Sequence, residues 1–547
     1  MLRNIALLAA LFASTLSAHP LEAVKEKRGD DDWVSPVYTR IFQDPLVIPT
    51  QLQPMTTYTN ATTGEVFDFY QMTIDNFQKQ VYPGLQPADL QGYNGQVPGP
   101  LIKTTVGRRS VVRFINNVAK PASIHLHGSP SRPVFDGWAE DTIATGQYKD
   151  YVYPNYSPRT LWYHDHAVHI TAENVFHGQA GFYYVSDPAQ EAALALPQGA
   201  YDIPLLIVDK IYLSNGKTLS PATEDTSYYG DVIHVNGVPW PYLNVEPRKY
   251  RFRLLDGSTS RSYKMSIETS AGVKVPMKVI ATDAGYVENP VNTNTLIFAI
   301  AERYEIVVDF AAYAGQTLVM KNARDFSRNE DFAQTNKIMQ FRVGTTVSST
   351  AGNGAVPSTL VDLTFPTNTG TIDRHFKFER TNGEWRINGL GFADVANRIL
   401  AKPNAGAVEV WELENSSGGW AHPIHIHLID FKVLTRNGRG VEPYESAGFK
   451  DVVFLDENET VTVIARYHPW TGQYMFHCHN TVHEDQDMMA AFDVGDTKAV
   501  PAQGDQFSDP MNPTFRASAY TGTNVAQLMS ERLPYFAGLD IYSQMPV

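Results

Sequence analysis

The lone cysteine of the chain lies inside a histidine-rich motif. Residues 477–483 read HCHNTVH, and Cys478 is the single cysteine among 547 residues. If this segment is a β-strand, its side chains alternate between two faces, so Cys478 projects to one face and the flanking histidines to the other. The thiolate, with His483 and Met488 as further candidates, offers the donor set of a blue-copper electron-transfer site. The motif therefore predicts two metal sites on one strand, joined through two peptide bonds.

Three further histidine clusters could supply the second site. Together with HCHNTVH they hold ten of the 16 histidines: HLHG (His125, His127), WYHDH (His164, His166) and HPIHIH (His422, His425, His427). Two histidines at positions i and i+2 of a strand present both imidazoles on one face, where they serve one metal ion or two adjacent ions. An isolated pair is more simply explained as a partly exposed strand with hydrogen-bonded imidazoles. Four clusters, one of them around the only cysteine, favour metal binding.

A count of ligands indicates which metal chemistry the clusters suit. Cys478, His422, His483 and Met488 fill one copper site. The remaining eight histidines suit three coppers with open positions for an exogenous molecule: His125, His127, His164, His166, His425, His427, His477 and His479. One copper plus three store the four electrons that reduce dioxygen to two waters. Zinc does not fit, because it has no redox chemistry and a structural zinc site is complete with four ligands.

A recurring pattern of turns and strands indicates the elements that position these clusters. It begins at Asn94, Asn236 and Asn388, and the spacings of 142 and 152 residues match the size of one domain. Each copy is an Asn-Gly turn, a stretch rich in aliphatic residues or proline, a second turn and an alternating strand, such as residues 250–254. Short β-branched strands with Gly and Pro between them favour β-sandwiches or barrels over α/β units. The sequence thus predicts an all-β chain of three consecutive domains.

The predicted domains carry the clusters unequally. We expect domains at 45–195, 200–345 and 370–500, a flexible linker at about 345–370, and a tail at 501–547 with a short helix around VAQLMSERL. The first domain holds HLHG and WYHDH, the third holds HPIHIH and HCHNTVH, and the middle one holds no HxH motif. A metal cluster built from both sets must lie between the first and third domains, with the middle domain as a spacer.

The N-terminus predicts export. Residues 1–18 have the early arginine, apolar core and small residues of a secretory signal peptide, and a possible propeptide at 19–28 ends on a dibasic pair. No later apolar run is long enough to cross a bilayer. A single cysteine cannot form an internal disulfide, and a formal net charge of −14 disfavours nucleic acid or anionic membranes as partners. We expect a secreted monomer, and three sequons suit a glycoprotein: Asn60, Asn415 and Asn458.

The four histidine motifs, in this order, resemble those of the multicopper oxidases: HxHG, HxH, HPxHxH and HCHxxxHxxxxM. The resemblance covers most of the mature chain. It implies three consecutive cupredoxin-like Greek-key β-barrel or sandwich domains, with one type 1, one type 2 and two type 3 coppers per chain. By position it assigns His125 and His425 to the type 2 copper. It divides the other six histidines between the type 3 coppers: His127, His164 and His479 for one, and His166, His427 and His477 for the other.

Within the family, the segments around the motifs look most like those of fungal bilirubin oxidases, a group that also resembles bacterial spore-coat laccases. This implies a small-molecule reducing substrate, either a tetrapyrrole such as bilirubin or a phenol, with dioxygen as the acceptor. Fungal laccases in the narrow sense are one alternative, but they generally carry disulfides and often lack an axial methionine. A ferrous-ion oxidase is a second, and a non-catalytic copper carrier, for which the cysteine site alone would suffice, is a third.

Three further residues match functional positions of the family. Dioxygen reduction consumes one proton per electron, and Asp136 and Glu484 match acids that lie near the trinuclear copper cluster. Their structural alternatives are a turn aspartate and a surface glutamate. Trp420, two residues before His422, would line the rim where electrons enter, unless it is packed in the core.

Overall fold

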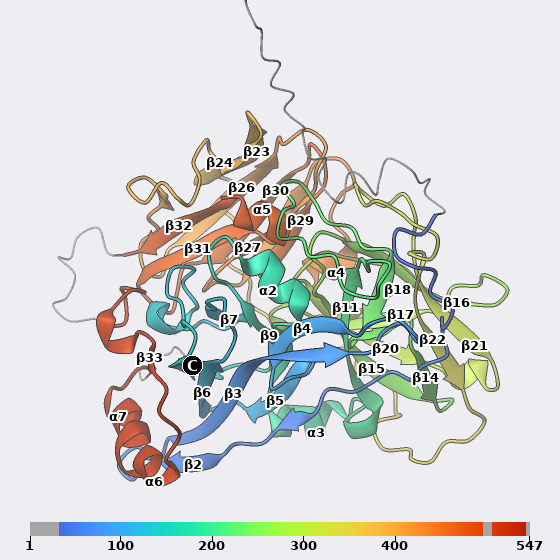
Figure 1. The fold of residues 1–547 in the computed structure, drawn as a ribbon, viewed down its shortest axis with the longest axis horizontal. Coiled ribbons are helices and arrows are strands. Elements are labelled where there is room, and N and C mark those ends of the chain that lie inside the picture. The colour runs from blue at the N-terminus through green and yellow to red at the C-terminus, as the bar shows by residue number, and fades with distance from the viewer. Residues whose placement is uncertain (1–31, 496–505, 543–547) are drawn as a thin grey trace, which may run out of the picture.

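The computed structural model describes residues 32–495 and 506–542 (Figure 1). The predicted signal peptide at 1–18 and propeptide at 19–28 lie outside the described residues, as do parts of the predicted tail. Most of the regular structure is β-strand, which confirms the predicted fold class. The strands form six sheets that fall into three pairs along the chain. We name these pairs the first unit (residues 51–186), the middle unit (residues 202–343) and the third unit (residues 374–494).

The first unit holds two histidine pairs in one of its sheets. In hydrogen-bonding order this sheet contains β1 (Gln51–Leu52), β5 (Gly99–Thr105), β10 (Ala180–Ser186), β9 (Arg159–Asp165) and β7 (Ile124–His127). The other contains β2 (Thr56–Thr59), β3 (Val66–Lys79), β6 (Arg108–Asn116), β8 (Gln147–Tyr153) and β33 (Ser518–Ala519), with β4 (Ala88–Tyr93) paired to β3. Helix α2 (Thr171–His177) follows β9, and helix α3 (Pro188–Leu194) leads out of the unit.

The middle unit has a seven-stranded and a five-stranded sheet. The larger contains β13 (Val238–Pro239), β12 (Val232–Val235), β11 (Asp202–Lys210), β15 (Lys249–Asp256), β20 (Arg303–Asp309), β17 (Met277–Thr282) and β18 (Gly285–Thr293). The smaller contains β14 (Tyr242–Val245), β22 (Lys337–Val343), β21 (Thr317–Asn322), β16 (Tyr263–Thr269) and β19 (Leu296–Phe298). Strand β15 alternates as predicted, yet its polar Arg251 and Arg253 are buried because they form ion pairs with Glu305.

The third unit contains the cysteine motif. One sheet contains β24 (Glu384–Ile387), β23 (Arg374–Thr381), β26 (Val408–Asn415), β30 (Thr460–Arg466) and β28 (Phe431–Arg436). The other contains β25 (Ile399–Ala401), β32 (Met489–Val494), β31 (Gly472–Cys478), β27 (His422–Ile426) and β29 (Val452–Leu455). Two short helices, α4 (Pro443–Ser446) and α5 (Thr481–Asp485), lie in its connections.

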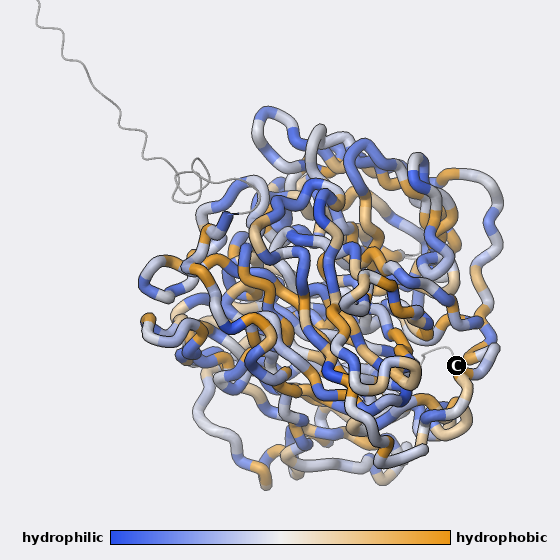
Figure 2. The backbone as a smooth tube through the Cα atoms, turned by 90° about the vertical axis from the view of Figure 1, so that its right-hand side faces the viewer, coloured by the Kyte–Doolittle hydropathy of each residue, from blue (hydrophilic) through white to orange (hydrophobic). Residues whose placement is uncertain are grey.

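The first and third units share one hydrophobic core. Phe114 and Tyr163 of the first unit belong to the same buried cluster as Ile424 and Phe476 of the third. The middle unit has a separate core around Phe252. Figure 2 shows long apolar stretches running through the interior of the molecule. The chain therefore folds back so that units far apart in sequence bury their apolar surface against each other, which is a large favourable contribution to folding.

The linker between the middle and third units contacts the middle unit at several points. Residues 345–370 carry no strand, and most of them are exposed or partly exposed. The guanidinium of Arg248 donates hydrogen bonds to the carbonyls of Ser349 and Ala351, and the Leu360 side chain is buried. These contacts hold parts of the linker against the middle unit, and the flexibility of the linker stays a prediction.

The tail forms the predicted helix and also packs into the core. The helix consists of α6 (Val525–Gln527), a π-helical turn η5 (Leu528–Arg532) and α7 (Leu533–Gly538). Leu533 and Phe536 are buried in the core that the first and third units share, and β33 extends the sheet of β8. The tail thus covers the junction of the two outer units.

Two predictions about the surface can be compared with the fold. Among the described residues, no helix is both long and apolar enough to span a membrane. Asn415 is buried, and its amide donates hydrogen bonds to the carbonyls of Trp420 and Asp456 at 2.7 and 2.8 Å. A glycan on Asn415 would displace both bonds, so this sequon does not suit glycosylation, whereas Asn458 is exposed.

Candidate metal centres

The motif around the cysteine is only partly a strand. Strand β31 ends at Cys478, and α5 begins after Asn480, whose side chain accepts a hydrogen bond from the Val482 amide. The predicted strand over the whole motif is wrong, because asparagine favours the N-cap of a helix. Alternation holds where the strand exists: His477 lies opposite His425 of β27, and Cys478 projects to the other face.

Helix α5 returns His483 to the cysteine, which creates the cysteine group (His422, Cys478 and His483). Sγ of Cys478 lies 3.3 Å from Nδ1 of His422 and 3.6 Å from Nδ1 of His483, and the two nitrogens are 3.1 Å apart. All three side chains are buried. Burial raises the pKa of the Cys478 thiol well above 9.0, so a thiolate here needs a bound cation. Burial lowers the pKa of His422 to about 3, which keeps its imidazole neutral and able to bind a metal.

The two methionines that could complete this group, Met488 and Met489, pack in different parts of the core. Met488 lies in the same buried cluster as Cys478, and its carbonyl accepts a hydrogen bond from the Cys478 amide at 3.1 Å. Met489 lies in β32 opposite His477, and its side chain packs in a different cluster with Trp138. Packing therefore favours Met488 over Met489 as the axial candidate.

Eight buried histidines form a second region, which we call the histidine cluster. The ligand atoms within each group of three lie within 4.8 Å of one another: His127, His164 and His479; His166, His427 and His477; and His125, His127 and His425. Nε2 of His477 lies 3.1 Å from Nε2 of His166 and 3.3 Å from Nε2 of His427. Nε2 of His125 lies 3.3 Å from Nε2 of His425. The first two groups are the two sets of three that the family resemblance implied, and the third joins the implied pair, His125 and His425, to His127.

The nitrogen atoms of this cluster fit copper. Within the described part of the chain, Nδ1 of His127, Nε2 of His164 and both ring nitrogens of His479 are buried without a hydrogen-bond partner. Such unpaired groups cost free energy. Burial and the neighbouring histidines hold the pKa of His479 well below 6.5, which favours the neutral imidazole, whose unprotonated nitrogen can bind a metal. Imidazoles in threes, beside a thiolate site with two imidazoles, are the donors that copper prefers.

Antiparallel pairing sets the histidines in two facing rows. In the first unit, β7 pairs with β9 and places His125 opposite His164. In the third unit, β27 pairs with β31 and places His425 opposite His477. The short distance between His125 and His425 shows that the two rows meet. The clusters of both outer units are thus brought together, as the sequence predicted.

The two acids lie against the histidine cluster rather than at the surface. Oδ2 of Asp136 lies 2.8 Å from Nδ1 of His427, and burial raises the pKa of Asp136 well above 3.8. Oε2 of Glu484 lies 3.2 Å from Nδ1 of His477. Burial alone would raise the pKa of Glu484, but His477 and His166 outweigh it and lower that pKa below 4.5. Burial therefore favours the protonated form of Asp136, while the neighbouring histidines favour the ionised form of Glu484, and acid–base chemistry uses such a difference between two carboxyl groups.

Helix α5 also fastens the third unit to the first. Oδ1 and Oδ2 of Asp485 accept hydrogen bonds from the amides of Thr171 and Ala172, at 2.8 and 2.9 Å. These amides open helix α2, so Asp485 caps a helix of the other unit, where a carboxylate is favourable. The ring of His169 adds a contact of 2.9 Å to the Asp485 carbonyl.

Trp420 is half-buried and leads to a second tryptophan. The rings of Trp420 and Trp385 lie 5.2 Å apart at 88°, and Trp385 stacks on the His483 ring at 3.8 Å and 28°. The guanidinium of Arg380 lies 5.0 Å from the ring of Trp385 and 4.9 Å from that of Trp420. We call Arg380, Trp385 and Trp420 the rim. Trp420 is therefore neither fully buried nor fully exposed, and its place at the rim where electrons enter stays a prediction.

Sequence reasoning missed three residues at these sites. Arg380 and Trp385 lie beside the cysteine group, and Asp451 contacts the histidine cluster through a 3.0 Å approach of Oδ1 to Nε2 of His127. None of the three stands next to a histidine motif. Their proximity arises from strand pairing between distant segments, so no local signal in the sequence could have identified them.

Comparisons with known proteins agree with this geometry. Three family models described as multicopper oxidase match residues 77–190, 162–346 and 364–498. A bilirubin oxidase of Albifimbria verrucaria is 48% identical over 527 residues, which cover 92% of this chain and 91% of that protein. A laccase of Bacillus stratosphericus is 32% identical and covers 83% of this chain and 99% of its own length.

Solved structures give the same result for the fold. The McoA multicopper oxidase of Aquifex aeolicus has a TM-score of 0.74 and 26% identity, and the match covers 83% of this chain and all of the other. Cupredoxin-like domains are thus confirmed. The 48% identity to the bilirubin oxidase over 92% of this chain, together with the three matching family models, leads to one assignment: the chain belongs to the multicopper oxidase family and is an oxidoreductase that uses dioxygen.

Proposed function

We propose that the protein is a secreted oxidase with one type 1 copper, one type 2 copper and two type 3 coppers. Its cysteine group and Met488 would hold the type 1 copper, and its histidine cluster the other three. Bound copper would supply one-electron oxidation of a tetrapyrrole or phenolic donor of the bilirubin type, and four-electron reduction of dioxygen to water. The observation that carries the proposal is the position of Cys478 between His477 and His479, because Cys478 belongs to the cysteine group while both of its neighbours belong to the histidine cluster.

The two acids support the dioxygen half of this function. Reduction of dioxygen to water consumes protons, and the site is buried away from bulk solvent. Asp136 lies beside His427 with a raised pKa, which favours its protonated form, and Glu484 lies beside His477 with a lowered pKa, which favours its ionised form. An acid that gives a proton and an acceptor that receives one, both within reach of the cluster, are the parts of a proton relay.

The rim supports a flat, anionic donor. A conjugated ring can stack on the exposed side of Trp420, and a carboxylate of the donor can pair with the Arg380 guanidinium. Electrons would then enter through Trp385 and His483, whose rings are stacked. Bilirubin-type tetrapyrroles have both features. Ferrous ion has neither, and it would meet the guanidinium as a like charge.

Dioxygen uptake across a panel of donors tests the proposal. Purified protein would be loaded with copper, the copper content measured, and uptake followed with bilirubin, simple phenols and ferrous ion. About four coppers per chain with uptake on bilirubin would support the proposal. Uptake with phenols alone would favour a laccase-like oxidase, and uptake with ferrous ion alone a ferroxidase. One copper per chain without uptake would favour a copper carrier.

Secretion is tested separately. The predicted signal peptide at 1–18 and the exposed Asn458 support export and glycosylation. Mass measurement of the secreted protein would show the mature N-terminus and any glycan. We expect a glycan on Asn458 and none on Asn415, whose amide is engaged in the fold.

A further inference from the structure

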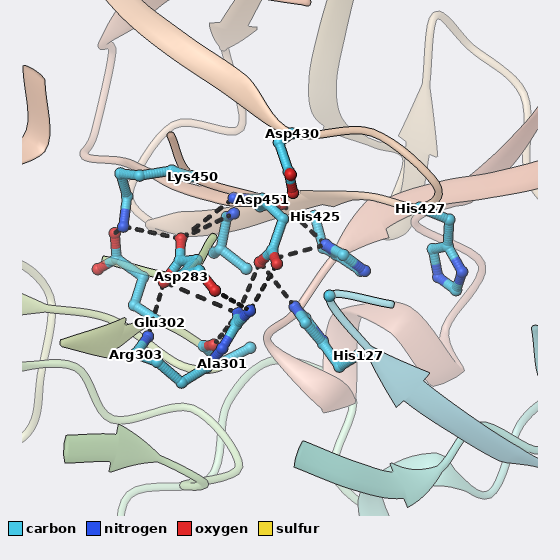
Figure 3. Close-up of polar contacts among 12 residues, drawn as sticks. His127, Asp283, Ala301, Glu302, Arg303, His425, His427, Asp430, Lys450 and Asp451 are labelled. Atoms are coloured by element: carbon cyan, nitrogen blue, oxygen red, sulfur yellow. Dashed lines mark hydrogen bonds and ion pairs between the residues drawn. The ribbon is translucent and has the colours of Figure 1, made fainter. Parts of the chain in front are cut away.

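The middle unit reaches the histidine cluster through one buried arginine. Arg303 begins β20, and its guanidinium forms an ion pair with Asp451 of the third unit, at 2.6 Å for Nη1 to Oδ1 and 2.5 Å for Nη2 to Oδ2. Both side chains are fully buried. Figure 3 shows this fork of two bonds, with His127 and His425 on the far side of the Asp451 carboxylate. The middle unit is therefore more than the spacer that the sequence predicted.

Asp451 holds two candidate copper ligands that the family resemblance assigns to different coppers. Its Oδ1 lies 3.0 Å from Nε2 of His127, and its main-chain carbonyl oxygen lies 2.8 Å from Nδ1 of His425. Each bond engages the ring nitrogen that points away from the centre of the cluster, and so it fixes the tautomer and the direction of the opposite nitrogen. Nδ1 of His127, left unpaired, is the nitrogen that would bind metal.

Arg303 has the bonds that a fixed support requires. Besides the two bonds to Asp451, its guanidinium donates to the carbonyls of Thr160, Ala301 and Asp283, at 3.2, 3.0 and 3.0 Å. All five donors of the guanidinium are therefore used, and the planar fork cannot rotate without breaking several bonds at once. Thr160 belongs to the first unit, so this one side chain contacts all three units.

The main chain near Asp451 is fixed from the same side. The Asp451 amide donates to Oδ2 of Asp283 at 3.2 Å, and the same carboxylate pairs with Lys450 at 2.8 Å. Lys450 also pairs with Glu302 at 2.9 Å. In this buried network each positive side chain contacts negative ones. Buried ion pairs add little to the free energy of folding, but they fix the positions of the groups that they join. The middle unit thus holds both the side chain and the backbone of Asp451.

Gly128, the last residue of HLHG, leaves the space for this pair. A Cβ atom at Gly128 would lie 2.5 Å from Nη2 of Arg303 and 2.7 Å from Oδ2 of Asp451. The backbone there has a φ of +87°, which also favours glycine. Glycine is therefore required after the first histidine pair, because any larger residue would collide with the ion pair between Arg303 and Asp451.

We propose that Arg303 is a positioning residue for copper ligands: it fixes Asp451, which aligns His127 through its carboxylate and His425 through its carbonyl. This inference rests on the proposed function. It assigns the middle unit a part in assembling the trinuclear copper cluster. The cysteine group has none of these contacts, so the type 1 copper should not depend on Arg303.

Copper retention in Arg303→Gln and Arg303→Lys tests the inference. Each copper-loaded protein would be titrated with a chelator, and the copper content and the electron paramagnetic resonance signals of type 1 and type 2 copper would be followed. For Arg303→Gln we expect trinuclear copper to be held about ten- to a hundredfold more weakly, with a changed type 2 signal and an unchanged type 1 signal. Arg303→Lys keeps the charge but not the fork, so it should restore retention only in part.

Arg251→Gln is the matched control. Arg251 is also a buried arginine of the middle unit, and its carboxylate partners are Glu305 and Glu191 rather than Asp451. It should lose thermal stability yet keep wild-type copper retention and signals. If Arg303→Gln does not fold, Arg303→Lys provides the test by the same criteria.

Two results would overturn the inference. One is wild-type retention and type 2 signal in the folded Arg303 variants, and the other is an equal loss in Arg251→Gln. The wild-type protein separates this failure from failure of the proposed function. Wild type with about four coppers and insensitive variants would refute only the role of Arg303. Wild type without copper in the histidine cluster would refute the proposed function, and the inference with it.

Discussion

The cysteine group and the histidine cluster lie on opposite sides of β31 but are assembled differently. The cysteine group comes from the third unit alone, within residues 422–483. The histidine cluster needs side chains from both outer units, and Asp451 and Arg303 extend its support to the middle unit. The first site is thus complete within one unit, whereas the second depends on how units meet. Damage to the interface should therefore affect the second site first.

The largest effect should come from Cys478→Ser, which removes the only sulfur donor of the cysteine group other than the axial candidate Met488. We expect complete loss of blue colour and of donor oxidation, because serine cannot supply a soft thiolate to copper. The histidine cluster should keep its copper. Absorption spectra and metal content check this. A Cys478→Ser protein that stayed blue would show that Cys478 does not bind the blue copper.

His164→Ala should show the opposite pattern. His164 belongs only to the histidine cluster, so the blue absorption should persist. Dioxygen uptake should fall by more than about a hundredfold, because losing a ligand should cost more than losing a residue that only supports a ligand. Spectra and uptake would be measured on the same preparation. Loss of the blue absorption with the other coppers still bound would mean that the two groups are assigned to the wrong sites.

Asp136→Asn should slow only the dioxygen step, by about a hundredfold or more. Because burial raises the pKa of Asp136, the side chain holds a transferable proton, and the rate should fall as pH rises and that proton is lost. The Asp136→Asn protein should lose this pH dependence, since an amide has no such proton to give. Stopped-flow measurement separates anaerobic bleaching by the donor from reoxidation by dioxygen. Equal slowing of both phases would instead indicate a structural role.

Met488→Leu should have a smaller effect, confined to the cysteine group. Removal of a weak axial donor destabilises the oxidised copper more than the reduced one, so the reduction potential should rise. Met489→Leu is the matched control, because Met489 packs in a different cluster. A redox titration in which only Met489→Leu raised the potential would transfer the axial role to that residue.

Arg380→Gln should have the smallest effect, at the rim. Arg380 is partly exposed, so its pairing with a donor carboxylate should change the KM for bilirubin only about two- to fivefold, and the KM for a neutral phenol not at all. Arg374→Gln in the same strand, where Arg374 pairs with Glu409, is the control. Equal changes for both donors would argue against a carboxylate contact.

The sequence predicted those parts of the molecule that depend on local geometry. Alternation along a strand separates Cys478 from its histidine neighbours, and the distribution of the histidine motifs over the repeats implied that the outer units meet. The start of α5 was also readable, since Asn480 is a preferred N-cap residue, but the strand prediction passed over it. This error concealed how His483 returns to the cysteine.

Other parts could not be predicted, because they depend on contacts across long separations. Asp451 meets His127 across 324 residues, and nothing near either residue indicates the other. Arg251 and Arg253 of β15 are likewise buried because they form ion pairs with Glu305, which the alternating pattern of the strand does not indicate. In each case a charged side chain is buried because it pairs with a residue from a distant segment, and the periodicity of the sequence does not show such a partner.

Helix α5 restricts which changes of chain length the third unit can accept. Its consecutive residues His483, Glu484 and Asp485 face the cysteine group, the histidine cluster and helix α2, respectively. One residue inserted in the helix just before His483 would rotate everything beyond it by about 100°. All three contacts would then be lost together, although no side chain had been replaced. Insertions and deletions within residues 481–485 should therefore be tolerated less than substitutions, because the length of this short helix sets the relative positions of the two metal sites and helix α2.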